Sequence, residues 1–225
     1  MCIRDSGGAG AVRYVGPGAD AVIARFPEAL VHAGPPSKAG RVQAWVVGPG
    51  LGDGRQAEAA VADVLAADVP VLVDADGLRL LDAETVRTRT APTVLTPHAG
   101  EAAALLGTAR EEVESGRLTA VRELAARYRA TVLLKGSTTL IAEARDTPVR
   151  VNPTGTAYLA TAGSGDVLSG LTGSLLAAGL APRDAASVGA YLHGLAARHG
   201  SDGAPVSAQD VADGIPAAWR DVRAG

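Results

Sequence analysis

Short apolar runs alternate with longer amphipathic stretches along most of the chain. The runs are rich in β-branched residues and are bounded by Gly, Pro or Asp, a pattern typical of buried strands. The stretches between them carry Ala and Leu at helical spacing, which predicts helices that cover a sheet. The predicted strands are residues 12–15, 42–48, 69–76, 92–97, 131–136, 138–143 and 149–152. The predicted helices between them are residues 54–67, 99–107 and 116–130.

The C-terminal third of the chain is mostly helical. Residues 163–199 are interrupted by a short loop, after which Pro182 is placed to open the next helix. The sequence SAQD at residues 207–210 predicts a capping box and a last short helix before Pro216. Because strands and helices alternate over the rest of the chain, we expect an α/β fold with a parallel sheet. The sequence holds no repeat or linker, so a single domain over residues 7–225 is expected.

Composition and charge limit the class of partner. The chain has 225 residues, 47% of them hydrophobic, which is enough to bury a substantial core. The net charge is -3 and Lys and Arg are scattered, so no basic face invites a nucleic acid. No apolar stretch reaches the roughly 18 residues that span a bilayer. We therefore expect a soluble cytoplasmic protein with neither a nucleic-acid nor a membrane partner.

The metal-binding residue types are few. Cys2 is the only cysteine, which excludes an internal disulfide and a thiolate zinc cluster. The four histidines show no metal-ligand spacing. Residues 1–6, MCIRDS, differ from the Ala, Val and Gly-rich sequence that follows, and their codons can spell a transposon-end adapter of sequencing libraries. We expect residues 1–6 to be an adapter-derived artefact rather than a genuine short start, with the natural start missing.

Polar or glycine-rich sequence follows four of the predicted strands. In open α/β sheets, ligands collect beyond the carboxyl ends of the strands, so these residues should meet at one rim. Fold class alone leaves the chemistry open, because such sheets carry many functions. The residues expected at this rim are Gly48, Gly50 and Gly52, then Asp74 and Asp76, then His98 and Glu101, and finally Lys135, Gly136 and Thr139.

The sequence TAGSGDVLSG at residues 161–170 opens an apolar helix. A helix that begins near Gly163 leaves its first N–H groups without intrahelical partners, at the positive end of its dipole. Glycines let such amides approach a phosphate closely. Asp166 lies in the first turn, where the same field would keep it ionised and able to accept a proton. The pattern predicts phosphoryl transfer to a hydroxyl; the alternative is that Asp166 only stabilises the helix start and the glycines only turn the chain.

Residues 152–182 resemble the C-terminal signature of the ADP-dependent NAD(P)H-hydrate dehydratases, members of the ribokinase-like superfamily. The same family is echoed in the expected order at residues 46–52, 70–78, 94–101 and 132–141. The resemblance covers nearly the whole chain after Ser6. It implies a ribokinase-like three-layer α/β/α fold with a mostly parallel central sheet.

The activity that the resemblance implies is repair of hydrated nicotinamide cofactors. Such enzymes phosphorylate the hydroxyl of (6S)-NADHX or NADPHX and then eliminate phosphate to restore NADH or NADPH. ADP is the implied co-substrate, with AMP and phosphate as products, and Mg²⁺ the implied cofactor. We also expect a homo-oligomer, with a tetramer as one form. Residues 181–200 are apolar enough to pack against either the core or a neighbouring subunit.

The chain departs from the family at its start. Members carry a preceding glycine-rich segment, so the resemblance implies that a first strand and helix are missing, roughly 30 residues or more for a typical βα unit. An epimerase domain, fused in some members, would also lie upstream.

At the phosphate-binding end, the resemblance assigns roles to residues that match its motifs. Asp166 would be the base that contacts the substrate hydroxyl, and Gly163, Ser164 and Gly165 would form the anion hole. The loop KGSTT would bind the nucleotide together with Gly165. The loop residues are Lys135, Gly136, Ser137, Thr138 and Thr139. For Lys135 the alternative is a solvated lysine at a strand end.

The remaining matches concern the hydrated dinucleotide and the metal. Gly52 and His98 would contact the substrate, although a histidine after a strand is also a common turn residue. Glu101 would help to hold Mg²⁺ through waters or would cap a helix. Asp74 and Asp76 are either caps of the following helix or site residues. Asn152 and Thr154 are second-rank candidates near the phosphate.

Two other functions remain compatible with the residues. One is a related kinase of a small alcohol, of the hydroxyethylthiazole or hydroxymethylpyrimidine kinase type. The other is a nucleotide-binding module without turnover, which the presence of Asp166 disfavours because binding alone gains little from a carboxylate that faces a phosphate.

Overall fold

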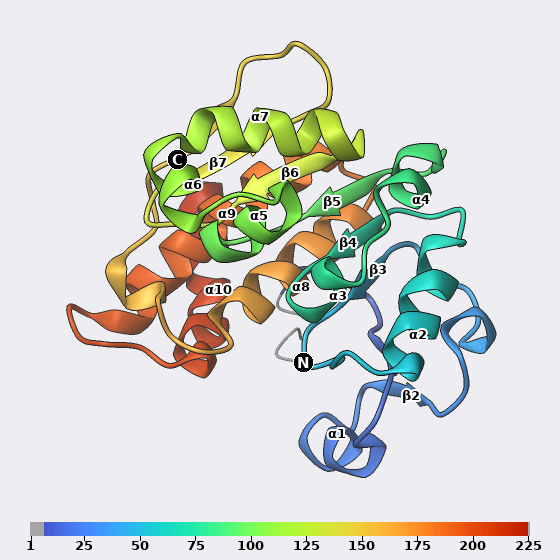
Figure 1. Cartoon of the computed structure of the whole chain (residues 1–225). Coiled ribbons are helices and arrows are strands. Elements are labelled where there is room, and N and C mark those ends of the chain that lie inside the picture. The colour runs from blue at the N-terminus through green and yellow to red at the C-terminus, as the bar shows by residue number, and fades with distance from the viewer. Residues whose placement is uncertain (1–6, 225) are drawn as a thin grey trace.

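The computed structural model describes residues 7–224. Within this part of the chain, six strands form the central sheet in the order β3-β4-β5-β6-β7-β8 (Figure 1). The first four pair in parallel, and β7 and β8 are antiparallel to their neighbours. All six were predicted, with longer bounds. The strands are β3 (Trp45–Val47), β4 (Val71–Val73), β5 (Thr93–Leu95), β6 (Thr131–Leu134), β7 (Thr139–Ala142) and β8 (Arg150–Asn152).

Helices cover both faces of this sheet, as Figure 1 shows. One layer consists of α2 (Arg55–Leu65), α3 (Asp76–Arg79), α4 (Ala83–Thr88), α5 (Ala99–Leu106), α6 (Arg110–Ser115) and α7 (Arg117–Tyr128). The other consists of α8 (Ser164–Ala177), α9 (Pro182–Ser201) and α10 (Ala208–Ala224). Short 3-10 turns lie at Pro36–Lys38 and Ala157–Leu159.

The alternation of side chains along the strands fixes these layers. On β4, Val71 and Val73 pack against the cluster that contains α2, α5 and α7, whereas Leu72 packs against α8 and α9. β6 repeats the pattern, with Val132 on the first face and Leu133 on the second. Both faces of the central strands are therefore apolar, as expected for strands buried between two layers of helices. The predicted three-layer α/β/α architecture is confirmed.

A small second sheet precedes the main one. It pairs β1 (Arg13–Val15) in parallel with β2 (Leu30–His32), joined by α1 (Ala19–Arg25), and lies at the bottom of Figure 1. β1 was predicted and β2 was not. The reason is that β2 is only three residues long and its Leu30 is exposed, so no apolar run marks it in the sequence.

Helix α10 differs from its predicted length. The expected capping box is present, since the Ser207 amide donates to Asp210 Oδ2 (2.8 Å) and the Asp210 amide donates to Ser207 Oγ (3.3 Å). The helix does not end before Pro216, however, but continues to Ala224.

The prediction of a short last helix is wrong because tertiary packing outweighs the proline. Pro216 removes one backbone hydrogen bond from the helix interior, at a cost of about 3 kcal/mol. Its ring lies on the exposed face, while Val211, Ile215 and Ala218 on the opposite face are buried in the cluster shared with α8 and α9. The buried face holds the helix together across the proline.

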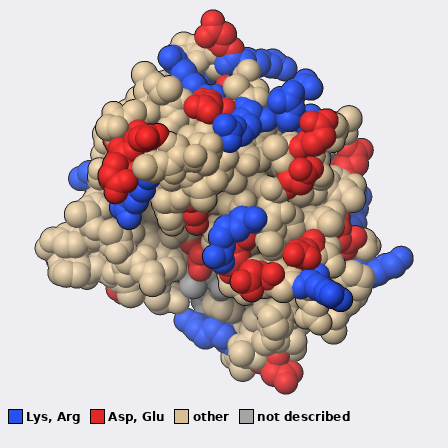
Figure 2. Space-filling view, in the orientation of Figure 1, with Lys and Arg blue, Asp and Glu red and all other residues tan. Residues whose placement is uncertain are grey.

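The apolar residues 181–200 lie largely in helix α9, which packs within this chain. Its face that includes Ala186, Ala190 and Leu192 is buried within this chain, against the sheet, α8 and α10. None of the helices in residues 7–224 combines the length and apolar character that a membrane crossing needs. Basic and acidic side chains are interspersed over the face shown in Figure 2.

The contact of α10 with α9 gives a stability prediction at Gly214. Replacing glycine by alanine inside a helix normally stabilises it by about 1 kcal/mol. Here a Cβ on Gly214 would lie 2.2 Å from the Ala196 carbonyl oxygen. We therefore expect Gly214→Ala to lower the free energy of unfolding by about 1 to 3 kcal/mol in chemical denaturation. Asp213→Ala, at the adjacent exposed position, should change it by less than about 0.5 kcal/mol. Stabilisation by Gly214→Ala would contradict the close packing.

Candidate active site

A cavity of about 750 Å³ opens at the carboxyl ends of β4, β5 and β6, beside the start of α8. Three of the four predicted rim segments, after β4, β5 and β6, line this cavity together with the start of α8, whereas Gly48, Gly50 and Gly52 lie outside its lining. Of the sequence-predicted site residues, the cavity is lined by Asp74, His98, Lys135, Gly136, Ser137, Thr139, Asn152, Gly163, Ser164, Gly165 and Asp166. Gly52, Asp76, Glu101, Thr138 and Thr154 lie outside this lining.

The start of α8 forms one wall of the cavity. Gly163 has a positive φ of 81°, a conformation that favours glycine, and its carbonyl accepts the Val167 amide as the helix begins. A Cβ on Gly165 would lie 3.4 Å from Lys135 Nζ, so the backbone passes close to this lysine. The amides of Gly165 and Asp166 belong to the first turn, where N–H groups have no intrahelical acceptor. They are available to an anion in the cavity.

Asp166 is half-buried in the first turn of α8. Burial raises the pKa of its carboxyl above the ordinary value of 3.8, and the nearby Asp74 carboxylate raises it further, while Lys135 acts in the opposite direction. The sequence predicted that the helix field would favour the ionised form. Desolvation and like charge outweigh this effect, so Asp166 is a stronger base than an exposed aspartate.

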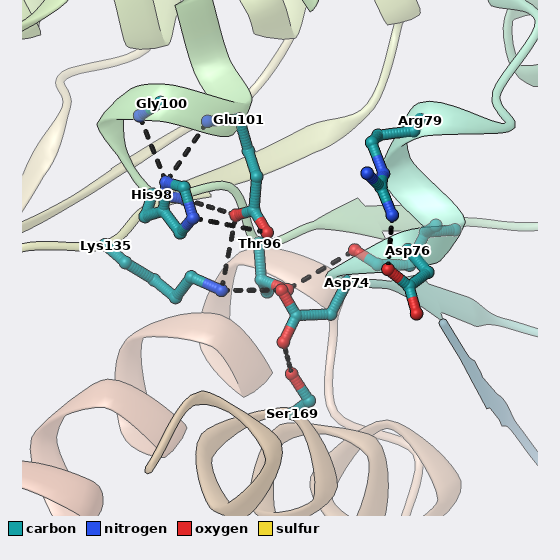
Figure 3. A network of polar contacts seen from close by, with 10 residues as sticks. Asp74, Asp76, Arg79, Thr96, His98, Gly100, Glu101, Lys135 and Ser169 are labelled. Carbon is teal, nitrogen blue, oxygen red and sulfur yellow. Dashed lines mark hydrogen bonds and ion pairs between the residues drawn. The ribbon is translucent and has the colours of Figure 1, made fainter. Parts of the chain in front are cut away.

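Lys135 lies at the floor of the cavity, in the network drawn in Figure 3. Its Nζ is 2.6 Å from Asp74 Oδ1 and 3.6 Å from Glu101 Oε2. The Asp74 side chain is 1% exposed, and its second oxygen accepts a hydrogen bond from Ser169 Oγ on α8 (2.6 Å). Lys135 is thus held by a buried carboxylate rather than solvated at a strand end.

His98 and Glu101 form a capping box at the start of α5. His98 Nδ1 accepts the amides of Gly100 (3.0 Å) and Glu101 (3.1 Å), and the His98 amide donates to Glu101 Oε2 (2.7 Å). His98 Nε2 lies 3.5 Å from Glu101 Oε1, and the ring is 59% exposed on the cavity side. The interpretation of His98 as a turn residue is confirmed, since one nitrogen caps the helix; the ring also lines the cavity, and its contact with a substrate stays a prediction.

The turn after β4 aims its two aspartates in different directions. Between them Ala75 has a φ of 49°, an uncommon conformation for a residue with a side chain. Asp76 accepts hydrogen bonds from the Gly52 amide (2.9 Å) and from Arg79 Nη2 (2.7 Å). The N-cap of α3 is Ala75, without a side-chain bond, so neither aspartate acts as its cap. Asp76 instead fastens the Gly52 loop outside the cavity.

The sequence analysis missed several side chains of the cavity. Among them are Arg110 and Glu114, which form an ion pair (2.8 Å), and then Arg117 and His193. Arg117, at the start of α7, donates through Nη2 to the carbonyl oxygens of Leu134 (3.2 Å), Lys135 (3.2 Å) and Thr138 (3.0 Å). His193 on α9 reaches the start of α8. Both are far in sequence from the motifs that they contact, and both lie inside predicted helices, where nothing in the local pattern distinguishes them.

His193 supports the start of α8 from behind. Its Nε2 lies 3.0 Å from the Ser164 carbonyl oxygen and 3.3 Å from Ser164 Oγ. Because a carbonyl oxygen only accepts, Nε2 carries the proton. Burial lowers the pKa of His193 to about 4; the bond to Ser164 opposes this shift, and the Lys135 charge adds to it. The imidazole is therefore neutral at neutral pH.

The described side chains would supply only part of the coordination shell of a bound metal. Among the described residues, no group of three His, Cys, Asp or Glu side chains is placed to hold a metal ion. Mg²⁺ commonly uses one or two carboxylates, with waters and substrate phosphates completing its shell. The carboxylates of Asp74, Glu101 and Asp166 around Lys135 fit that mode and do not form a protein cage.

The buried imidazole of His193 predicts a pH dependence of stability. Its pKa is about 4 in the folded chain and 6.5 in the unfolded one, so the unfolded state takes up the proton first. Stability is complete above pH 6.5 and should fall by roughly 3 kcal/mol as the pH drops toward 4. In denaturant titrations, His193→Gln should reduce this loss, and His199→Gln, on an exposed part of the same helix, should not. An equal loss in His193→Gln and the unmodified chain would contradict the assignment.

Comparison with known proteins places this chain in a family. The profile of the NAD(P)H-hydrate dehydratase family matches residues 4–216. An ADP-dependent (S)-NAD(P)H-hydrate dehydratase of Neisseria meningitidis is 47% identical over 210 residues, covering 90% of this chain and 71% of that protein. The bifunctional NAD(P)H-hydrate repair enzyme Nnr of Mycobacterium leprae is 52% identical over 190 residues, 84% of this chain. The chain spans 39% of the length of that bifunctional relative.

Solved structures agree with the sequence comparison. The ADP/ATP-dependent NAD(P)H-hydrate dehydratase of Bacillus subtilis, co-crystallized with ATP and Mg²⁺ and soaked with CoA, has a TM-score of 0.80 at 31% identity, covering 90% of this chain and 77% of that chain. A ribokinase-like superfamily protein of Enterococcus faecalis has a TM-score of 0.80 at 24% identity, covering 96% and 78%. The predicted ribokinase-like fold is confirmed, and the chain belongs to the NAD(P)H-hydrate dehydratase family.

Proposed function

We propose that this chain catalyses the ADP-dependent dehydration of (6S)-NADHX and NADPHX to NADH and NADPH. The observation that carries the proposal is the placement of Asp166, the first amides of α8 and Lys135 around one cavity. A base, an anion-binding helix start and a fixed cation are the parts that phosphoryl transfer to a hydroxyl needs. The names of the relatives supply the substrate class.

The proposed reaction has two steps. In the first, Asp166 takes the proton of the hydrate hydroxyl, whose oxygen bonds to the terminal phosphorus of ADP while the bond to AMP breaks. In the second, phosphate leaves the ring carbon and a neighbouring ring proton is lost, so the double bond of the reduced nicotinamide is restored. The raised pKa of the half-buried Asp166 carboxyl supports its proposed role in the first step, because a more basic carboxylate accepts a proton more readily.

Two groups of the protein would stabilise the negative charge of the transferred phosphoryl group. The amides of Gly165 and Asp166 carry the positive end of the α8 dipole, and Lys135 lies beside Gly165. Asp74 fixes Lys135 in place, so this cation needs no reorganisation during transfer. We assign Gly163, Ser164 and Gly165 to the anion hole through their backbone. Ser164 would contribute least, because its amide donates to the Thr161 carbonyl oxygen (3.3 Å) and its Oγ lies against His193.

The nucleotide and the hydrated dinucleotide are assigned to different parts of the cavity. The loop from Lys135 to Thr139 would hold the nucleotide, and the exposed edge of His98 would contact the hydrated dinucleotide. Gly52 stays a predicted substrate contact, from a loop beside the cavity that Asp76 fastens. Mg²⁺ would arrive with the nucleotide, with Glu101 reaching it through waters, and would offset the carboxylates. The expected homo-oligomer and cytoplasmic location stay predictions.

A direct assay tests the proposal. The protein is mixed with (6S)-NADHX, ADP and Mg²⁺, and the recovery of NADH is followed by its absorbance. We expect recovery with stoichiometric release of AMP and phosphate. No recovery, together with phosphorylation of a thiazole or pyrimidine alcohol, would select the related kinase instead.

In this assay, Asp166→Asn should abolish turnover, with a loss of at least about 100-fold, because the amide keeps the shape and cannot accept the proton. Its affinity for ADP, measured by calorimetric titration, should stay within about twofold of the unmodified protein. Asp213→Ala, a change at an exposed residue outside the cavity lining, serves as the control with unchanged turnover. Retained turnover in Asp166→Asn would remove the base from the mechanism.

The raised pKa of Asp166 predicts the acid side of the pH profile. The base works when ionised, so kcat/KM should fall as the pH drops through a pKa above 3.8. Asp74→Asn removes the carboxylate that raises this pKa and should move the acid limb to lower pH, along with any loss of rate. The melting temperature checks that the variant folds. A limb that moves to higher pH would contradict the coupling of the two aspartates.

A further inference from the structure

A single arginine joins the two ends of the KGSTT loop. Arg117 is the first residue of α7, and its Nη2 lies within 3.2 Å of carbonyl oxygens from Leu134 and Lys135, before the loop turns, and within 3.0 Å of the Thr138 oxygen, after it. Charge-assisted bonds of this kind are roughly twice as strong as neutral ones. The pairing of β6 and β7 stops before the turn between them. The guanidinium bonds hold the backbone of this turn instead.

Among the described residues, the Arg117 guanidinium forms no direct ion pair. The nearest acid that acts on its charge is Glu114 on the preceding helix, which is itself paired with Arg110 (2.8 Å). The side chain is partly buried and lines the cavity beside Gly136 and Ser137. A cation that is surrounded by carbonyl oxygens and faces a cavity suits an anionic ligand there.

The same arginine occupies the space that a side chain at Gly136 would need. A Cβ added at this position would lie 2.7 Å from Arg117 Nη2 and 3.0 Å from Cζ. On the other side of the loop, a Cβ on Gly155 would lie 2.6 Å from the Ser137 carbonyl oxygen. The loop is therefore held between the guanidinium and the backbone at Gly155. Its second residue is a glycine because the arginine occupies the space of a side chain.

We propose that Arg117 is a positioning residue for the nucleotide, which holds the KGSTT loop in its binding conformation with Gly136 as its steric partner. This inference rests on the proposed assignment of the loop to the nucleotide. The guanidinium sets the loop backbone, and it adds a positive charge to the nucleotide end of the cavity, away from the Asp74 and Lys135 pair.

The first experiment measures the loop without nucleotide. Hydrogen–deuterium exchange is compared for the unmodified chain, Arg117→Ala and Arg122→Ala, the last at an exposed arginine of the same helix. We expect Arg117→Ala to speed exchange of the amides at residues 135–139 by about tenfold, with β5 unaffected. Exchange that matches Arg122→Ala would overturn the clamp whatever the enzyme's activity.

The second experiment measures ADP with Mg²⁺ by calorimetric titration. Arg117→Ala should weaken ADP binding by about tenfold, and Arg117→Lys should restore only part of it, because a lysine keeps the charge but its shorter side chain does not bring the ammonium to the position of Nη2. Arg122→Ala should bind as the unmodified chain does. If the unmodified chain itself does not bind ADP, the proposed function fails, and the exchange experiment still decides the role of Arg117.

A double-mutant cycle with Gly136 separates the clamp from a general loss of stability. Gly136→Ala should weaken ADP binding by about tenfold in the unmodified chain and by less than about twofold in the Arg117→Ala background, where the space is vacant. Equal effects of Gly136→Ala in the two backgrounds would overturn the steric partnership. Thermal melting of each variant confirms that the comparison is made between folded proteins.

Discussion

The buried ion pair between Asp74 and Lys135 is the interaction on which the site depends. It joins the carboxyl ends of β4 and β6 across β5, and the Ser169 hydroxyl attaches it to α8. A buried charge that loses its partner costs several kcal/mol, so neither residue can change alone without moving the other. Through this pair, the sheet fixes the position of Lys135 relative to the start of α8, and hence the place where a phosphate can lie.

The same pair gives the cavity its acid–base character. Asp74 places a second carboxylate near Asp166, and the resulting repulsion together with burial raises the pKa of Asp166. An excess of carboxylates is unfavourable for a phosphate, and the helix amides, Lys135 and a divalent cation would offset it. In the proposed reaction, this arrangement would make Asp166 a stronger base and would make binding of an anion depend on a cation that comes with it.

The sequence predicted what is local and missed what joins distant segments. Short apolar runs rich in β-branched residues identified the strands of the main sheet, and the capping box at Ser207 is marked by its own residue types. Pro216 misled because the apolar face of α10, packed on α9, outweighs a local rule. Arg117 and His193 act on residues 17 to 29 positions away, so no spacing reveals them. The basicity of Asp166 also follows from burial, which its place in the first turn does not reveal.

The glycines of the site show how packing and ligand binding share one sequence signal. The glycines at the start of α8 were interpreted as backbone left bare for a phosphate, and Gly165 fits that interpretation, since only the side-chain tips of Lys135 and Asp74 lie near its missing side chain. At Gly48 the space is taken by the Asp74 carbonyl, and at Gly136 by the Arg117 guanidinium. These two glycines let the Asp74 carbonyl and the Arg117 guanidinium approach the backbone closely. This close packing forms part of the cavity wall. Bare backbone therefore marks a ligand only where no protein atom already fills the gap, a distinction that requires the folded arrangement.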